Sequence, residues 1–296
     1  MIKILADSTC DLSNTVLKLF DISLAPLTIN IDGKIYKDRV DIEPNDFYEM
    51  MEGLSEFPTT GTPSPTEYLE IMIKAVKDGF KEVLCICMSS GTSGAYQSAV
   101  IAKDYFYEGN PDSTVKIHVV DSKCMSHGSG WLVMKSAMMR EQGVSFEEIV
   151  EFIENCKTNV KHFLSVDDLN HLIKSGRLTN ASAFIGKILN LKPIMSMRNG
   201  KGAIVAKERG CKRVLKHYVH EFIKRNDKEI TEFVIIGYTS DIKIAETLKE
   251  KIEIETDFSG DIYIMQMGVS VGTHVGLGAI SMFFVEKRDN QYKNLS

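Results

Sequence analysis

The stretch "EVLCICMSSGTSGAYQSAVIAKDYFY" (residues 82–107) decides the fold class, because it contains a strand, a loop and a helix in direct succession. Residues 82–88 form a short apolar run typical of a buried strand, and residues 94–107 have the apolar spacing of a helix. The loop between them is rich in Ser, Thr and Gly. A strand that enters a helix through such a loop is the repeating unit of an α/β fold.

The same alternation continues along the chain. Helix-length segments separate the apolar runs, and crossovers of that length join parallel neighbours, as short hairpins cannot. We therefore predict a doubly wound, mainly parallel sheet in the first half of the chain. The further strands that we expect are 2–6, 114–120, 162–166, 192–197, 203–208, 232–238 and 261–267, and the further helices are 65–79 and 146–159.

The chain is long enough for two lobes, since domains typically have about 100–200 residues. A long charged helical pattern ends near residue 160, where a new series of strands and helices begins, so we predict lobes at 1–160 and 161–296. In the second lobe "MRNGKGA" (197–203) has Asn-Gly between apolar runs, which favours a hairpin. The second sheet is therefore expected to be mixed.

Composition excludes several classes of protein. The net charge of -5 and the absence of a basic stripe argue against nucleic-acid binding. No segment approaches the roughly 18 consecutive apolar residues of a membrane span, and the first residues resemble a strand rather than a secretory signal. The six cysteines are dispersed, as in a cytoplasmic protein with buried thiols. His217 and His220 share a helical face, but no further ligand completes a metal site.

Four loops have the composition of ligand-binding loops, which in α/β sheets follow the carboxyl ends of strands. They are "ADSTCDLS" (6–13), "TTGTPSPTE" (59–67), "SSGTSGAY" (89–96) and "VGTHVGLG" (271–278). In the first loop, Asp11 or Ser13 is expected to cap a helix.

The second loop is partly explained by helix capping. Ser64, Pro65 and Glu67 have the pattern of a capping box, with Pro at the first helical position. Thr60 and Thr62 have no role in this cap. Their hydroxyls either face solvent or point to a ligand near the helix N-terminus.

The third loop has three interpretations. Ser93 is the expected N-cap of the following helix. The same N-terminus, with its free N–H groups and nearby hydroxyls, also suits an anion. A nucleophilic serine would need Gly-x-Ser-x-Gly, but Ala95 replaces the last Gly, and no phosphate-binding Gly-x-x-x-x-Gly-Lys motif occurs.

The fourth loop combines glycines with Thr273 and His274. A histidine in a Gly-rich loop is a candidate donor to an anion. Its neighbour Thr273 adds a hydroxyl to the same loop.

Taken in order, these loops resemble motifs of the DegV family of fatty-acid-binding proteins. "ADSTCDLS" resembles the opening Asp-Ser-Thr element, "TTGTPSP" the Thr-Ser-x-Pro-Ser motif and "SSGTSGAYQSA" the Ser-Gly-Thr-Tyr-x-Ser motif. "LIKSGRLT" (172–179) is similar to the Gly-Arg-Leu element, and "VGTHVGLG" to the Gly-Thr-His-x-Gly-Pro-Gly element. The resemblance covers nearly the whole chain.

The resemblance implies a two-lobed α/β protein that is not itself an enzyme and needs no cofactor. Such a protein holds a long-chain fatty acid between its lobes and presents the carboxylate to a separate ATP-dependent fatty-acid kinase, for acyl-phosphate formation and phospholipid synthesis. Arg177 would face that partner. The residues that would bind the carboxylate are Thr60, Thr62, Ser93, Thr273 and His274.

The acyl chain needs an apolar wall, and "AFIGKILNLKPIMSM" (183–197) in the second lobe is a candidate, with Met195 and Met197 as adaptable side chains. Core packing of the second sheet explains the same residues equally well. Two other functions remain open, a hydrolase that uses Ser93 and a lipid-responsive regulator.

The sequence departs from the family pattern at three positions. Gly61 stands where Ser is usual, Ala95 where Thr is usual, and Leu277 where Pro is usual. The first two changes remove hydroxyls near the expected head-group site. The remaining hydroxyls and His274 would still supply several donors to a carboxylate.

Overall fold

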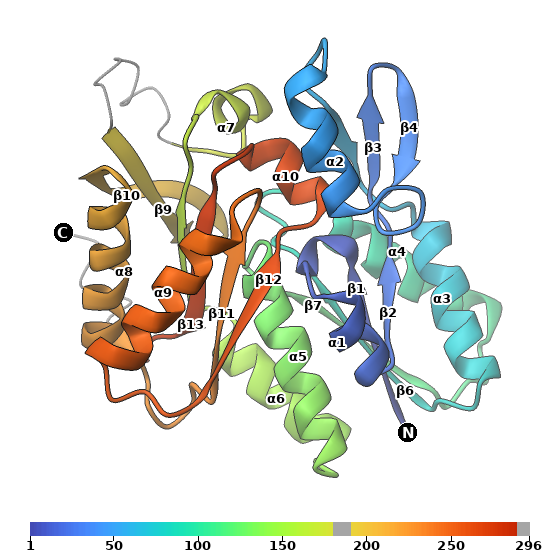
Figure 1. Cartoon of the computed structure of the whole chain (residues 1–296). Coiled ribbons are helices and arrows are strands. Elements are labelled where there is room, and N and C mark those ends of the chain that lie inside the picture. The colour runs from blue at the N-terminus through green and yellow to red at the C-terminus, as the bar shows by residue number, and fades with distance from the viewer. Residues whose placement is uncertain (180–190, 289–296) are drawn as a thin grey trace.

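The computed structural model describes residues 1–179 and 191–288 and confirms the α/β class. Two larger sheets stand side by side, the first built from the N-terminal part of the chain and the second from the C-terminal part (Figure 1). The boundary at residue 160 remains a prediction, although the first strand of the second sheet, β8, begins at Val160.

The N-terminal sheet is entirely parallel, with the strand order β2-β1-β6-β7. Ala6 lies opposite Ile86, and Cys87 lies opposite Asp121, so the carboxyl ends of these strands reach the same edge. The loops that carry the predicted site therefore begin side by side. The strands are β1 (Ile2–Asp7), β2 (Ile22–Ala25), β6 (Glu82–Cys87) and β7 (Lys116–Asp121).

The C-terminal sheet is mixed, as predicted, with the order β10-β9-β8-β13-β11-β12. Among the strand pairs described for this sheet, only β11–β12 is parallel. The turn between β9 and β10 has positive φ at Asn199 (52°) and Gly200 (75°), which confirms the hairpin. The strands are β8 (Val160–Ser165), β9 (Leu191–Arg198), β10 (Lys201–Arg209), β11 (Phe233–Tyr238), β12 (Asp261–Gln266) and β13 (Ile280–Val285).

A third, antiparallel sheet of order β4-β3-β5 was not expected from the sequence. Its strands have three or four residues, too few for a visible alternation of apolar and polar side chains. It matters for the site because Thr60 lies on β5, opposite Ile29 of β3. The strands are β3 (Thr28–Ile31), β4 (Lys34–Lys37) and β5 (Thr59–Gly61).

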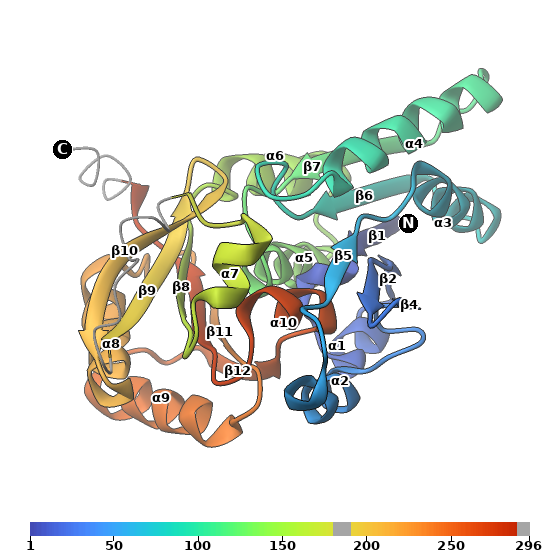
Figure 2. The same cartoon turned by 90° about the horizontal axis from the view of Figure 1, so that it is seen from above.

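Helix α5 (His127–Glu141) packs between the two larger sheets and joins their cores (Figures 1 and 2). Trp131 is fully buried, stacks on Phe233 and donates its indole N–H to the Phe233 carbonyl at 3.0 Å. Every residue from 127 to 137 is buried. A helix that is covered on all sides lacks a polar face, so its sequence shows no amphipathic period.

The remaining long helices cover the outer faces of the sheets (Figure 2). Helices α3 and α4 pack on the N-terminal sheet, and α8 and α9 pack on the C-terminal sheet. Helix α6 lies beside α5. Their bounds are α3 (Pro65–Lys77), α4 (Ala95–Gly109), α6 (Phe146–Cys156), α8 (Cys211–Arg225) and α9 (Ile242–Glu255).

Local capping explains where several helices begin. The predicted capping box of α3 is confirmed, because Ser64 Oγ accepts from Glu67 N at 3.3 Å and Glu67 Oε2 accepts from Ser64 N at 2.9 Å. Ser13 caps the first helix, as one of the two expected candidates. The shorter helical elements are η1 (Ser8–Cys10), α1 (Asn14–Leu19), α2 (Pro44–Met50), η2 (Met51–Gly53), α7 (Asn170–Ser175) and α10 (Val269–Val275).

Candidate functional site

A cavity lies between the two lobes, at the edge where the parallel strands β1, β6 and β7 end. The loops after these strands supply Thr9, Ser93 and Ser126 to its wall. Strand β9 and helix α10 supply the wall on the side of the C-terminal lobe. This position fits the rule that ligands of α/β folds bind outside the carboxyl ends of strands.

Most of the cavity wall is apolar, and both lobes contribute to it. Strand β9 supplies Met195 and Met197, which the sequence suggested for this role. Residues 183–190 of the same predicted wall lie outside the described residues. The cavity is narrow, with a volume of about 100 Å³. Its apolar lining residues are Leu27, Met88, Met125, Leu164, Leu172, Leu178, Met195, Met197, Met267, Val271, Val275 and Phe283.

Hydroxyl groups from distant parts of the chain meet at this cavity. Thr60 and Thr62 come from β5 and the residues after it, and Ser93 comes from the loop after β6. The site is thus assembled from the segments that the sequence singled out. A Cβ atom placed on Gly94 would lie 3.7 Å from the Thr62 methyl group, so the second and third loops are in contact.

Ser93 is not the N-cap of α4, contrary to the prediction. Gly94 occupies that position, and Ser93 lies one residue earlier. The Ser93 hydroxyl accepts from Ala95 N at 3.2 Å, so the loop turns before the helix begins. Because that bond uses an acceptor lone pair, the hydroxyl proton of Ser93 remains available to a ligand.

His274 reaches the cavity from α10 and contacts Thr60 across the lobes, with 2.9 Å between Nε2 and the Thr60 hydroxyl oxygen. Burial lowers the pKa of His274 to about 4, and the nearby charge of Arg177 acts in the same direction. The imidazole is therefore neutral at pH 7. A neutral imidazole donates from one nitrogen and accepts at the other.

The fourth candidate segment is a helix and not the expected Gly-rich loop. Thr273 and His274 both belong to α10, which begins after Gly268 and ends before Gly276. The two side chains point in different directions. Thr273 donates its hydroxyl to the Val269 carbonyl at 2.9 Å and is absent from the cavity wall, because a threonine within a helix readily bonds the carbonyl one turn earlier.

Arg177 lines the cavity and is partly exposed, and its expected role toward a partner remains a prediction. Its guanidinium donates to the carbonyl of Ser175, the last residue of α7. Among the described lining residues it is the one side chain with a permanent charge, and none is an aspartate or glutamate. The electrostatics of the wall therefore favour an anion.

Sequence reasoning did not include seven polar residues of the wall, namely Thr9, Thr92, Ser126, His162, Ser196, Ser270 and Ser281. Ser126 has the uncommon backbone angles φ 53° and ψ −143°, and its hydroxyl donates to Asp11 at 2.6 Å. Asp11 also accepts from Gly268 N, at 2.9 Å, and so connects the N-terminal lobe to α10. The sequence pattern that pointed to this part of the wall was the Asp-Ser-Thr element of the first loop, which contains Thr9.

Burial shifts the pKa of two polar groups near the cavity, in opposite directions. Burial lowers the pKa of His162 to about 3, so its neutral ring donates from Nδ1 to the Val160 carbonyl at 2.9 Å and accepts from Met125 N at 3.3 Å. Burial also raises the pKa of Asp11 to about 7.

The departures from the family pattern have partial structural explanations. A Cβ atom on Gly61 would lie 2.4 Å from Thr28 Oγ1, so a side chain there requires Thr28 to move. Ala95 is fully buried at the first position of α4. Leu277 packs, partly buried, against the cluster that contains Phe47 and Val269.

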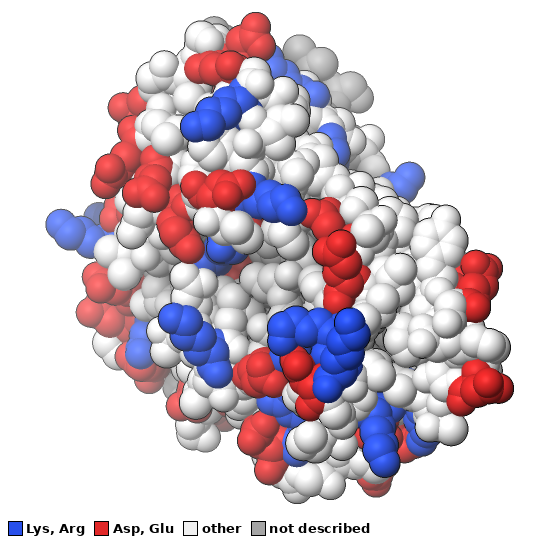
Figure 3. Space-filling view, turned by 90° about the vertical axis from the view of Figure 1, so that its right-hand side faces the viewer, with Lys and Arg blue, Asp and Glu red and all other residues white. Residues whose placement is uncertain are grey.

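The sequence also led us to expect no metal site, no membrane-spanning helix and no basic surface for nucleic acid. Within residues 1–179 and 191–288, His, Cys, Asp and Glu form no group of three or more that could hold a metal ion. No helix in that part of the chain combines the length and apolar character needed to cross a bilayer. On the face shown in Figure 3, basic and acidic side chains are intermingled rather than gathered into one broad field.

The fold and the cavity define a class of two-lobed α/β protein that encloses an apolar cavity with hydroxyls and a cation in its wall. The chain belongs to the DegV family, because residues 1–287 match the family model described as "Uncharacterised protein, DegV family". A DegV domain-containing protein of Caldanaerobacter subterraneus subsp. tengcongensis is 35% identical in an alignment of 294 residues that covers 97% of this chain and 99% of that protein.

Solved structures give the same assignment. A fatty-acid-binding DegV family protein from Thermus thermophilus is 26% identical, with a TM-score of 0.86 over 97% of this chain and 99% of its own. A stearic-acid-binding protein from Eubacterium ventriosum is 27% identical, with a TM-score of 0.83 over 97% of this chain and 99% of its own. Both relatives are described as fatty-acid-binding proteins, and for the second the fatty acid is stearic acid.

Proposed function

We propose that this protein binds a long-chain fatty acid, with the acyl chain in the apolar part of the cavity and the carboxylate beside Thr60, Ser93 and His274. The observation that carries the proposal is the composition of the wall. It is mostly apolar, and its permanently charged side chain is the cation Arg177. An amphipathic anion matches both properties. The fatty acids bound by the relatives from Thermus thermophilus and Eubacterium ventriosum support the same ligand class.

The available donors suit a carboxylate. Ser93 retains its hydroxyl proton, as argued above. The neutral ring of His274 can donate from Nε2 to Thr60, which leaves the Thr60 proton free for the ligand. Thr62 also lines the cavity, and its side chain is exposed. Thr273 is not included in this site, because its hydroxyl is used within α10.

The cavity must become larger when the acyl chain of the fatty acid enters it. A volume of about 100 Å³ is below the range of about 300–1,000 Å³ that is usual for ligand pockets. Side chains of the wall therefore move on binding. Methionines suit this role, since their unbranched side chains adopt many shapes at low cost. Met88, Met125, Met195, Met197 and Met267 all line the cavity.

We infer further that the bound carboxylate is presented to a separate ATP-dependent fatty-acid kinase in the cytoplasm. The exposure of Thr62 and the partial exposure of Ser93 and Arg177 put the polar end of the cavity near the surface. A carboxylate oxygen attacks the γ-phosphorus of ATP, ADP leaves, and an acyl phosphate forms for phospholipid synthesis. The kinase supplies the nucleotide site, and Arg177 lies where the two proteins would meet.

A serine hydrolase is less well supported. Ser93 would need a base in reach and an acid behind that base. His274 instead contacts Thr60, and the described wall of the cavity contains no carboxylate. A lipid-responsive regulator would use the same fatty-acid site and differ only in what senses its occupancy.

The first experiment is denaturing extraction of the purified protein followed by mass spectrometry of the extract. We expect a long-chain fatty acid, and we expect delipidated protein to take up added palmitate or oleate. Incubation with a fatty-acid kinase and ATP should give an acyl phosphate, which hydroxylamine traps as a hydroxamate. The proposal is overturned if the purified protein contains no fatty acid and does not bind added palmitate or oleate. The kinase step is overturned if the protein binds fatty acid but no hydroxamate forms.

The second experiment tests the head-group site. Ser93→Ala should weaken palmitate binding by roughly 10- to 150-fold, because a hydrogen bond to a charged group contributes about 1.5–3 kcal/mol. Ser98→Ala, in helix α4 just after that loop but outside the cavity wall, is the matched control. Equal effects of the two substitutions would contradict the assignment of Ser93.

A further inference from the structure

The β6–α4 loop, which carries Ser93, touches the C-terminal lobe through Ser89. Ser89 is fully buried, and its hydroxyl donates to the Gly200 carbonyl at 2.6 Å. Gly200 is in the turn of the β9–β10 hairpin, more than one hundred residues away in the sequence. A single hydroxyl thus connects the turn of this hairpin to the loop.

Two glycines make this close contact possible. A Cβ atom on Gly91 would lie 2.5 Å from the Gly200 carbonyl oxygen, and a Cβ atom on Gly200 would lie 2.7 Å from Ser89 Oγ. Gly200 also has φ +75°, which other residues rarely adopt. The loop and the turn therefore fit together only because both positions lack a side chain.

The main chain of Ser89 holds Ser93 directly. The Ser89 carbonyl accepts from Thr92 N at 3.0 Å and from Ser93 N at 3.1 Å, and the Thr92 hydroxyl donates to the same oxygen at 3.0 Å. The Ser89 hydroxyl also accepts from Gly91 N at 3.3 Å. A displacement of Ser89 would therefore also displace Ser93.

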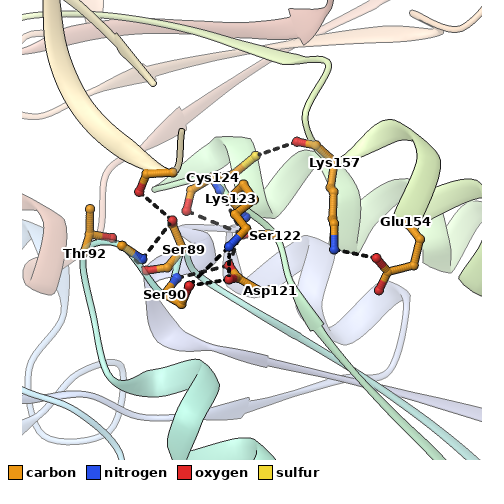
Figure 4. Close-up of polar contacts among 11 residues, drawn as sticks. Ser89, Ser90, Thr92, Asp121, Ser122, Lys123, Cys124, Glu154 and Lys157 are labelled. Carbon is orange, nitrogen blue, oxygen red and sulfur yellow. Dashed lines mark hydrogen bonds and ion pairs between the residues drawn. The ribbon is translucent and has the colours of Figure 1, made fainter. Parts of the chain in front are cut away.

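A neighbouring network fixes the same loop to β7 and not to the hairpin. Ser90 N donates to Asp121 at 3.0 Å, and Lys123 is ion-paired with Asp121 at 2.5 Å. Figure 4 shows Ser89, Ser90, Asp121 and Lys123 grouped together. The Ser90–Asp121–Lys123 network does not involve the Ser89 hydroxyl, so Ser89→Ala removes only the bond to Gly200 and the bond from Gly91 N within the loop.

We propose that Ser89 is a positioning residue of the carboxylate site. Its bond to Gly200 holds the turn of the β9–β10 hairpin against the loop and thereby sets where the Ser93 hydroxyl points. This inference rests on the proposed function, since it gives Ser93 the carboxylate as its partner.

The test measures binding of palmitate and of methyl palmitate, which lacks the negative charge, to delipidated protein. Ser89→Ala should weaken palmitate binding by about five- to tenfold, the usual effect of one hydrogen bond, and change methyl palmitate binding less than about twofold. Gly91→Ala should give the same pattern, because its new methyl group would collide with the Gly200 carbonyl oxygen and displace the turn. Ser136→Ala is the control, because it removes a similar buried bond, to the Leu132 carbonyl at 2.8 Å, within α5.

A double-mutant cycle separates the two proposals. If Ser89 acts through Ser93, then Ser89→Ala should have no further effect on palmitate binding in a Ser93→Ala background. An additive loss, or an equal loss for palmitate and its methyl ester, would show a general structural role and overturn the inference. If Ser93→Ala alone leaves palmitate binding unchanged, the proposed carboxylate site itself is wrong.

Discussion

The hydroxyl of Thr60 offers the sharpest test of the head-group site, because valine has nearly the same shape without the oxygen. In Thr60→Val, the bond to His274 Nε2 and the expected bond to the carboxylate are both lost. The strand should survive, since Thr60 lies on β5 and valine is favoured in strands.

Thr60→Val should lower the stability of the protein less than it lowers the affinity for palmitate. A bond between neutral groups contributes about 1 kcal/mol, so the free energy of unfolding of the lipid-free protein should fall by about that amount. A bond to a charged carboxylate contributes about 1.5–3 kcal/mol, which corresponds to a loss of affinity of roughly 10- to 150-fold. Binding should therefore suffer more than stability.

Displacement of a fluorescent fatty acid by palmitate measures the affinity, and urea denaturation of the lipid-free protein measures the stability. The control is Thr59→Val, which changes the neighbouring residue of the same strand, where the side chain is exposed and outside the cavity wall. The reasoning is refuted if Thr60→Val binds palmitate as tightly as the unmodified protein, or if Thr59→Val weakens binding equally.

Three further outcomes are expected. Gly61→Ser should lower the melting temperature, and Thr28→Ala should restore it, because the new side chain would meet Thr28 Oγ1. Since burial holds the pKa of His162 at about 3, below its unfolded value near 6.5, the unfolded chain alone takes up a proton as the pH falls below 6.5. Protonation of His162 in the unfolded chain should therefore lower the free energy of unfolding by about 2 kcal/mol between pH 7 and pH 5. In urea titrations, His162→Gln should abolish this loss. Asp11 acts in the opposite direction, because its raised pKa of about 7 makes the folded protein hold a proton that the unfolded chain releases from about pH 4 upward. Its contribution to stability should fall as the pH rises from about 4 to 7, and Asp11→Asn should remove that slope in the same titrations.

Local chemistry made part of this structure predictable. The capping box of Ser64 and Glu67 and the turn at Asn199–Gly200 involve neighbours in the sequence, so their spacing is sufficient to identify them. The strands on either side of the predicted loops were found for a similar reason, since each is a short apolar run between turns and helices.

Other features depend on contacts between distant segments. Helix α5 shows no amphipathic pattern because both sheets cover it, and α10 has only seven residues between two glycines. The prediction of Ser93 as an N-cap failed because Ser89 turns the loop one residue earlier than the sequence suggests. Thr273 and His274 are adjacent in sequence, but only the helix decides that His274 alone faces the cavity.

The sequence by itself determined the α/β class, the loops that carry the hydroxyls and the family, because these depend on residue types and their order along the chain. Only the tertiary structure decided which side chains meet. It brought Thr60 to His274 across 214 residues, placed Arg177 in the cavity wall, and added Ser126 and Ser270. The physical reason is that a cavity wall is formed by packing between lobes, and packing partners leave no periodic trace in the sequence of either segment.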